Sequence, residues 1–196
     1  HLIYTMTMRR LILITVALMA CAFSASAQKG SVKYQGEVFV SGNVAKSDVS
    51  LTLCDETIEG TPMMYGLSVQ TIQGAKFGEY FSAGIGTGID FLVGIQGDVS
   101  MMAILIPIYA DFKFWIPTSG RLQPYIMAEA GGSFAIHPLT IRPLYGGGVG
   151  LKITERFAMS LNYINDGYKV YDKEVGNALK SMYKEHKVQL RFTWIF

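Results

Sequence analysis

The chain is poor in the residue types that build disulfide scaffolds and metal sites. It has two cysteines and three histidines among 196 residues. Cys21 falls in a segment that we expect to be removed on export, so Cys54 would stand alone and form no disulfide within the mature chain. The scattered histidines and the single remaining cysteine also lack the spacing of metal ligands. We therefore expect no disulfide framework, no metal and no cofactor.

Charge and long apolar runs are scarce as well. Charged residues make up 16% of the chain and the net charge is +2, which gives no indication of a nucleic-acid partner. Hydrophobic residues make up 50% and the mean hydropathy is +0.28, yet no run after Ala27 approaches the roughly 20 apolar residues of a spanning helix. High hydrophobicity without a spanning helix favours a transmembrane β-barrel.

The first residues have the pattern of a secretory signal peptide. A basic start, Met8-Arg9-Arg10, is followed by the apolar residues 11–22 and by a small-x-small cleavage site, Ala25-Ser26-Ala27. We therefore expect residues 1–27 to be upstream sequence and signal peptide. Residues 28–196 would then form one mature domain.

A lipoprotein signal is the alternative interpretation of this region. Leu18-Met19-Ala20-Cys21 resembles a lipobox with an unusual Met in its second place, and it would put a lipid on Cys21. The small-x-small site that follows directly favours ordinary cleavage, and a barrel needs no lipid anchor.

Strict alternation of apolar and polar residues is clearest at the carboxy-terminus. One face carries Val188, Leu190, Phe192, Trp194 and Phe196, and the other carries Gln189, Arg191 and Thr193. Seven more segments share this period of two. The expected strands are residues 32–41, 63–73, 80–91, 104–116, 122–137, 141–152, 156–171 and 182–196. The pattern predicts an all-β fold, a transmembrane antiparallel up-and-down β-barrel of about eight strands.

The connections between these strands alternate in length. Short turns are expected near residues 74–76, 117–120 and 153–155, and longer stretches at residues 42–62, 94–100 and 172–181. The short connection at residues 137–140 is an exception. Short periplasmic turns, longer outer loops and two periplasmic termini are typical of an even-stranded barrel.

Proline placement agrees with this assignment. Pro107, Pro124 and Pro143 fall in the first few residues of their expected strands. Because proline cannot donate a hydrogen bond to a neighbouring strand, it is tolerated there more readily than in a strand centre.

Several short motifs carry a family resemblance. They are Leu67-Ser68-Val69-Gln70, Ala110-Asp111-Phe112-Lys113, Pro124-Tyr125, Tyr145-Gly146-Gly147-Gly148-Val149-Gly150 and the terminal Phe196. Over essentially the whole mature chain, the sequence resembles the outer-membrane protein β-barrel domain family, the small OmpA- and OmpX-like barrels. The resemblance implies a bacterial outer-membrane location among outer-membrane lipids. It also implies that periplasmic chaperones and the barrel-assembly machinery handle the chain, with Phe192, Trp194 and Phe196 as the assembly signal.

Charged residues with inward parity form the main candidate site. They are Lys33, Glu37, Asp90, Asp111, Lys113, Glu129, Arg142, Lys152 and Arg191. An eight-stranded barrel has a lumen that side chains fill, so we expect these charges to pair rather than to line an open channel. We predict that Arg191 lies near Glu37 or its neighbours and that Glu129 pairs with a cation such as Lys113 on the adjacent strand.

Aromatic residues concentrate towards the expected strand ends. Most fit girdles at the two lipid interfaces, whereas Trp115 and Tyr125 have inward parity and are expected to help to close the lumen. The set is Tyr65, Trp115, Tyr125, Tyr145, Tyr168, Tyr171, Tyr183, Trp194 and Phe196.

No catalytic constellation emerges from the pattern. The glycine-rich segments 84–88 and 146–150 precede no helix that could present its amino-terminus to a phosphate. Ser133 and His137 share a strand face but lie about 13 Å apart at about 3.3 Å per residue, beyond hydrogen-bond reach. We therefore expect no enzyme. The expected role is structural or surface interaction with an unknown ligand through the outer loops, with a narrow solute channel as the alternative and a lipid-modifying enzyme less favoured.

Overall fold

A computed structural model of the protein describes residues 32–53, 56–96, 99–136, 140–172 and 179–196. The predictions for residues 1–27, including the alternative lipid site at Cys21, lie outside these ranges, as do Cys54 and His137. Within these ranges, no helix is long and apolar enough to cross a membrane. The strands are β1 (Val32–Leu53), β2 (Glu56–Gly60), β3 (Met63–Phe77), β4 (Phe81–Gln96), β5 (Val99–Trp115), β6 (Gln123–Ala135), β7 (Thr140–Lys152), β8 (Phe157–Asp172) and β9 (Leu179–Ile195).

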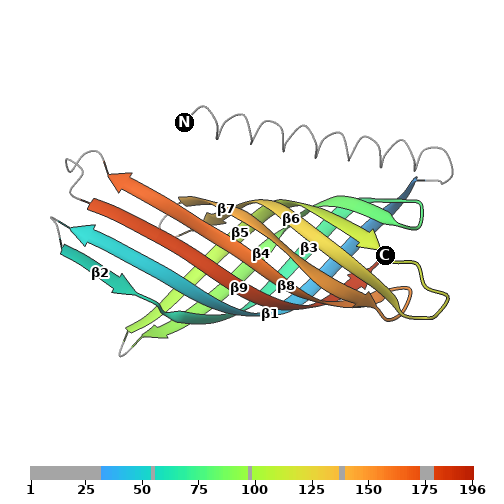
Figure 1. Cartoon of the computed structure of the whole chain (residues 1–196), viewed down its shortest axis with the longest axis horizontal. Coiled ribbons are helices and arrows are strands. Elements are labelled where there is room, and N and C mark those ends of the chain that lie inside the picture. The colour runs from blue at the N-terminus through green and yellow to red at the C-terminus, as the bar shows by residue number, and fades with distance from the viewer. Residues whose placement is uncertain (1–31, 54–55, 97–98, 137–139, 173–178) are drawn as a thin grey trace.

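Antiparallel pairing joins β1 to both β2 and β3 and each strand from β3 to β9 to the next, and pairing of β1 with β9 closes the barrel (Figure 1). Along one edge of β1, β3 pairs as far as Lys46 and β2 pairs from Val49 onward. The other edge pairs with β9 from Glu37 to Leu53. Since β2 therefore extends β3 past Thr61-Pro62, the barrel in the described residues has eight strands. This confirms the expected all-β, antiparallel, up-and-down barrel.

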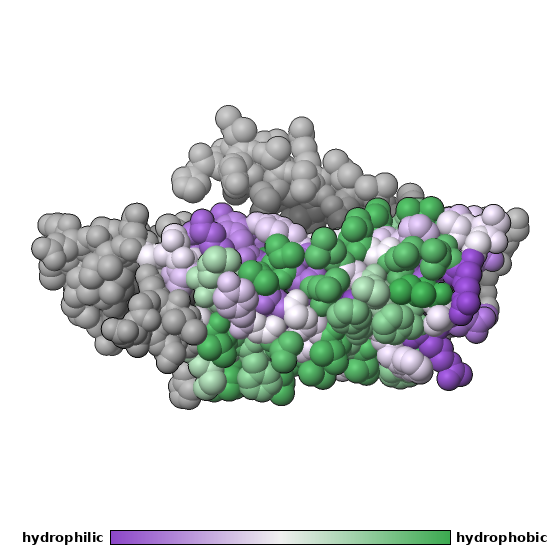
Figure 2. Space-filling view, turned by 90° about the horizontal axis from the view of Figure 1, so that it is seen from below, coloured by the Kyte–Doolittle hydropathy of each residue, from purple (hydrophilic) through white to green (hydrophobic). Residues whose placement is uncertain are grey.

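The wall of the barrel is apolar outside and polar inside, as the alternation predicts. The exposed fraction is 42–56% at Val188, Leu190, Phe192 and Trp194 on β9 and at Phe196 directly after it, whereas it is at most 4% at Gln189, Arg191 and Thr193. Exposed Val, Ile, Leu, Phe, Tyr and Met side chains continue this surface onto the other strands. Figure 2 shows them as a band along the wall, with hydrophilic residues gathered at one end. Such a band is the lipid-facing surface of a transmembrane barrel.

Both described chain ends lie at the same end of the barrel, where the short turns also lie (Figure 1). The turns predicted at residues 117–120 and 153–155 fall between β5 and β6 and between β7 and β8. The turn predicted at residues 74–76 was wrong, because β3 continues to Phe77. The observed turn lies between β3 and β4 and contains Gly78, whose φ of 64° is a conformation that favours glycine.

The strands at the opposite end are longer than predicted. Residues 42–53 belong to β1 and residues 56–60 to β2, so the loop predicted at residues 42–62 was wrong. The loops predicted at residues 94–100 and 172–181 are likewise shortened by β4, β5, β8 and β9. Pairing of β1 with β9 satisfies the backbone as far as Leu53. A strand that extends beyond the lipid needs no apolar outward face. The alternation of apolar and polar residues can therefore end before the strand does.

Pro107 was placed wrongly by the sequence analysis. It lies in the middle of β5, and the pairing of β4 with β5 lapses between Thr87↔Ile108 and Asp90↔Leu105. A proline nitrogen cannot donate a hydrogen bond, which explains the break. Pro124 and Pro143 are near the starts of β6 and β7, as predicted.

Candidate functional site: the filled lumen

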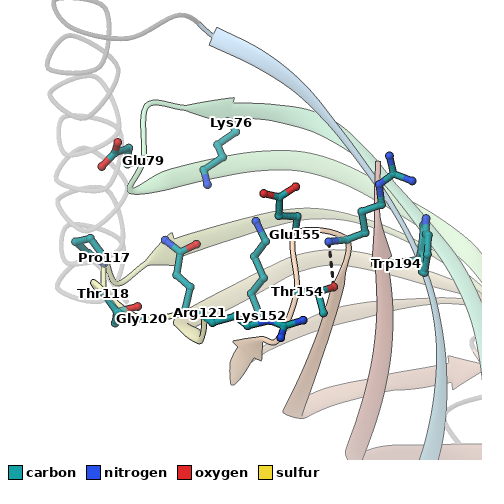
Figure 3. Close-up of a pocket in the computed structure, with 12 residues that line it drawn as sticks. Lys76, Glu79, Pro117, Thr118, Gly120, Arg121, Lys152, Thr154, Glu155 and Trp194 are labelled. Atoms are coloured by element: carbon teal, nitrogen blue, oxygen red, sulfur yellow. Dashed lines mark hydrogen bonds between the residues drawn. The ribbon is translucent and has the colours of Figure 1, made fainter.

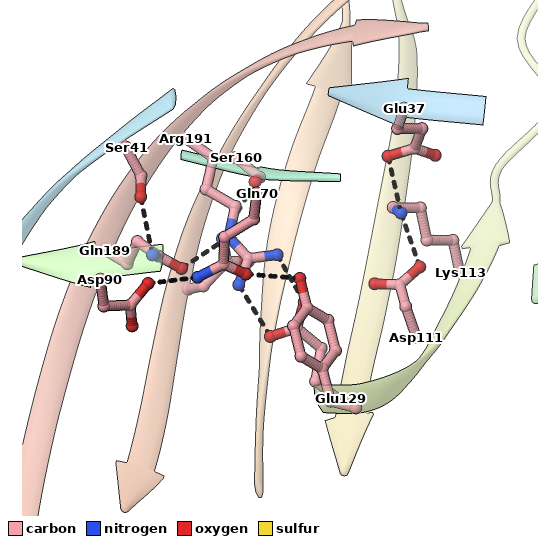
Figure 4. Close-up of polar contacts among 12 residues, drawn as sticks. Glu37, Ser41, Gln70, Asp90, Asp111, Lys113, Glu129, Ser160, Gln189 and Arg191 are labelled. Carbon is pink, nitrogen blue, oxygen red and sulfur yellow. Dashed lines mark hydrogen bonds and ion pairs between the residues drawn. The ribbon is translucent and has the colours of Figure 1, made fainter. Parts of the chain in front are cut away.

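The first lumen cluster is centred on the Lys113 ammonium group. Its Nζ atom lies 2.9 Å from Oε2 of Glu37 and 2.6 Å from Oδ1 of Asp111. These side chains project inward from β1 and β5, and all three are buried (Figure 4). One cation therefore serves two carboxylates.

The second cluster joins opposite walls of the barrel. Both terminal nitrogens of Arg191 on β9 donate to the Glu129 carboxylate on β6, with Nη2 2.8 Å from Oε2. Nε of Arg191 donates to Gln189, and the guanidinium carbon lies 4.3 Å from the centroid of the Phe39 ring. A bidentate arginine–carboxylate pair fixes both distance and orientation. Figure 4 shows this cluster apart from the Lys113 cluster.

Two further ion pairs lie inside the barrel. Lys187 Nζ is 2.8 Å from Oδ2 of Asp90, and Asp90 also accepts a hydrogen bond from Gln70. An Arg142 terminal nitrogen is 3.7 Å from Oε2 of Glu185. All four charged side chains of these pairs are buried, so attraction and hydrogen bonding offset the cost of removing them from water.

Three clusters of buried apolar side chains also fill the lumen, in addition to the charged clusters. One cluster comprises Phe39, Ile72, Tyr109, Leu144 and Ile164. A second comprises Ala45, Met64, Leu92, Leu105 and Ala135, and a third comprises Trp115, Tyr125, Met127, Ala158 and Ile195. The third layer lies at the turn end, where the Trp115 and Tyr125 ring centroids are 4.6 Å apart. The predicted inward role of these two rings is confirmed.

The structure brings five of the six residues of the predicted charge network into the lumen, namely Glu37, Asp111, Lys113, Glu129 and Arg191. Lys33 was wrongly included, because its side chain is exposed near the start of β1. The predicted pairing of Glu129 with Lys113 was wrong: Glu129 binds Arg191, and Lys113 binds Glu37. Arg191 does not pair with Glu37, but it packs on Phe39, a neighbour of Glu37 on the inward face of β1. In the register, Arg191 lies beside Ser41 and Glu37 beside Ile195, so stagger carries Glu37 away from Arg191 along the wall.

The sequence analysis missed Lys187, Glu185 and Asp166 as lumen residues. Lys187 and Glu185 share the parity of Gln189 and Arg191, and this signal was sufficient to place both of them inside. Asp166 accepts a hydrogen bond of 2.5 Å from the Ser133 hydroxyl. Asp166 has the inward parity of Ala158, Ser160 and Asn162 on the same strand.

Outward aromatic residues are exposed where described. Tyr65, Tyr145, Trp194 and Phe196 are lipid-facing, as the girdle prediction requires. The side chains of Tyr168, Tyr171 and Tyr183 lie outside the described part of the structure. Phe192, Trp194 and Phe196, the predicted assembly signal, share this outward face.

Comparison with known proteins identifies a fold. No family model and no curated protein matches the chain. The outer membrane protein OprG from Pseudomonas aeruginosa matches with a TM-score of 0.53 and 10% identity, covering 82% of this chain and 95% of OprG. The chain has the fold of the small outer-membrane barrels.

Other solved barrels also match over most of the chain. Neisserial surface protein A has a TM-score of 0.44 and 13% identity, covering 83% of this chain and 98% of that protein. Ail, the attachment invasion locus protein of Yersinia pestis, has a TM-score of 0.43 and 16% identity, covering 82% and 99%. At these identities the likeness concerns the fold and assigns no activity.

Proposed function

We propose that the protein is an integral outer-membrane barrel with a filled lumen, whose role is structural or surface interaction. The observation that carries the proposal is the burial of the charged lumen side chains, which are at most 4% exposed at Glu37, Asp90, Asp111, Lys113, Glu129, Arg142, Glu185, Lys187 and Arg191. A water-filled channel would leave its lining side chains in contact with solvent. Charges paired across a dry interior instead tie the strands together.

The apolar layers add a second argument against solute conduction. An ion moving along the barrel axis would have to pass the layer around Phe39 and Tyr109 and the layer around Trp115 and Tyr125. Both layers contain large rings that are almost fully buried. The narrow-channel alternative therefore requires rearrangement of at least two packed layers.

The outer end of the barrel is the part suited to surface interaction. On the lipid-facing side of β1, Val44 is followed by the polar residues Lys46 and Asp48, whose charged groups are 3.9 Å apart. Pairing of β1 with β9 nevertheless continues to Leu53, about 30 Å of strand beyond Val44. A paired wall of this kind would stand above the membrane and present its loops to the exterior.

The proposed orientation rests on the strand count, and the proposed assembly route rests on the family resemblance. With eight strands, both ends of the barrel domain lie on one side, and in outer-membrane barrels the short-turn side is periplasmic. We propose that the chain is exported, met by periplasmic chaperones and inserted by the barrel-assembly machinery, which would read Phe192, Trp194 and Phe196.

A non-catalytic role is part of the proposal. The Ser133 hydroxyl is committed to Asp166 within the buried lumen, where a substrate would have no access. His186 on β9 instead has its Nδ1 atom in contact with Tyr163 and, at 3.1 Å, with Asn165. Release of fatty acid from phospholipid or lipopolysaccharide by the purified barrel would contradict this part.

Single-channel recording in a planar bilayer tests the filled lumen. The purified, folded protein should add no stable open conductance, and gramicidin added afterwards should show that the same bilayer reports channels. A stable, sizeable conductance from the folded protein would favour the small-solute channel and overturn the leading proposal.

A further inference from the structure

A cavity opens at the turn end of the barrel, apart from the buried charge clusters. Its volume is about 820 Å³, and its lining includes four cationic and two acidic side chains. Lys76, Arg121, Lys152 and Arg156 are the cations, and Glu79 and Glu155 are the acids. The buried Trp115 ring lies beneath the two lysine side chains.

Lys76 and Lys152 approach this one ring from two strands. Their Nζ atoms lie 5.0 Å and 5.9 Å from the Trp115 ring centroid. Figure 3 shows the two side chains pointing toward each other across the mouth, Lys76 from β3 and Lys152 from β7. Each cation gains a contact with the ring face, but the two like charges repel each other.

These lysines differ from the cations deeper in the barrel. Lys113, Lys187 and Arg191 each have a carboxylate oxygen within 2.9 Å. Among the described residues, neither Lys76 nor Lys152 has a carboxylate within the 4.0 Å of a salt bridge, although two glutamates line the same cavity. The positive charges of these two half-buried ammonium groups are therefore not neutralised by a salt bridge.

We infer that this mouth binds a small anion bearing a phosphate group, held between Lys76 and Lys152 above the Trp115 ring. A phosphate has enough oxygens to accept hydrogen bonds from both ammonium groups at once, and its charge relieves their repulsion. Trp194, which is exposed on the outer wall, also lines the cavity. The mouth thus reaches the membrane surface, so the phosphate can belong to a soluble molecule or to a lipid headgroup.

Trp115 provides a direct readout, because the chain has two tryptophans. Trp194→Phe leaves Trp115 as the reporter in the full-length folded barrel, in a neutral detergent. Sodium phosphate, titrated at constant ionic strength, should change Trp115 fluorescence and reach saturation. In this background Lys76→Gln or Lys152→Gln should weaken the apparent affinity by about tenfold or more, as loss of a charge-assisted hydrogen bond implies.

Matched variants separate binding from a change of fold. Lys46→Gln removes a lysine at the opposite end of the barrel and should leave the titration unchanged. Lys76→Arg and Lys152→Arg keep the charge and should retain saturable binding. Far-ultraviolet circular dichroism establishes that each variant is folded before it is titrated.

A second arm distinguishes the two sources of phosphate. The same proteins are reconstituted into phosphatidylcholine vesicles with or without phosphatidylglycerol. A Trp115 change that needs phosphatidylglycerol and both lysines supports a lipid headgroup, whereas saturation by free phosphate supports a soluble ligand. The inference is overturned if neither phosphate source changes the fluorescence, or if Lys76→Gln and Lys152→Gln leave every change intact.

Discussion

The guanidinium group of Arg191 crosses the lumen and binds both carboxylate oxygens of Glu129. The two residues lie on β9 and β6, which are separated in the sheet by β7 and β8. The pair therefore holds together walls of the barrel that share no backbone hydrogen bonds. Its loss should weaken the closed barrel as a whole.

Glu129→Ala should lower the free energy of unfolding by about 3–5 kcal/mol, because it leaves the buried Arg191 charge uncompensated. Urea titration of the folded barrel in lipid vesicles measures the effect. Lys46→Ala, at an exposed ion pair, is the control and should change stability by less than about 1 kcal/mol. If Glu129→Ala is as mild as the control, the Arg191–Glu129 pair does not carry the stability assigned to it.

The Lys113 cluster should respond asymmetrically to substitution. Lys113→Met leaves Glu37 and Asp111 facing each other without a cation and should cost about 3–5 kcal/mol. Asp111→Asn leaves one carboxylate for one ammonium group and an amide oxygen that still accepts, so its cost should stay within about 1 kcal/mol. Equal losses for the two variants, measured in the same urea titration, would contradict the shared-cation arrangement.

Close packing inside the lumen gives a third prediction. A Cβ added at Gly86 would clash with the Tyr109 ring, whose hydroxyl donates to Gln70 at 2.7 Å. Gly86→Ala should therefore destabilise the barrel by about 1–3 kcal/mol. Gly42→Ala is the matched control, because a Cβ at Gly42 meets nothing within 4 Å. Similar urea midpoints for both variants would show a lumen looser than described.

The terminal aromatic residue is expected to act in assembly more than in stability. The Phe196 backbone exchanges two hydrogen bonds of 2.9 Å with Gly36, while its side chain is exposed on the lipid face. Phe196→Ala keeps the backbone bonds, and deletion of Phe196 removes them. Both changes should lower outer-membrane yield in cells far more than spontaneous folding into liposomes.

Two results would contradict the assembly role of Phe196. Equal losses in cells and in liposomes would show an effect on fold stability alone. Normal yield of Phe196→Ala in cells would show that the ring is no assembly signal.

The proposed orientation can be tested with thiol labelling of intact cells. Cys54 follows Leu53 in the sequence, and β1 ends at Leu53, away from the short turns. A membrane-impermeant maleimide should label it without permeabilisation. In a Cys54→Ser background, Thr118→Cys, between β5 and β6, should react only after the outer membrane is opened. The reverse labelling pattern would show that the barrel has the opposite orientation in the membrane.

Alternation along the chain was enough to predict the class of fold. Each strand carries its inward and outward faces as a local period of two, which holds whatever the neighbouring strand is. This is why Asp111, Lys113, Glu129 and Arg191 were assigned correctly to the lumen. The same parity marks Lys187 and Glu185, so their place in the lumen is also encoded in the local sequence.

The alternation of apolar and polar residues did not predict where the strands end. The polar outward positions of residues 42–53 predict a loop, yet pairing with β9 holds these residues in β1. Pro107 was expected near a strand start, but β5 begins at Val99, five residues before the predicted start at residue 104.

The partners of the buried charges were decided by the tertiary structure. Parity states that Glu37, Glu129, Lys113 and Arg191 point inward, but it gives no height along the barrel axis. The stagger between strands sets that height, and it brings Arg191 opposite Glu129 and Lys113 opposite Glu37. The meeting of Lys76 and Lys152 over Trp115 has the same origin, because three strands must close around the mouth before those side chains face one ring.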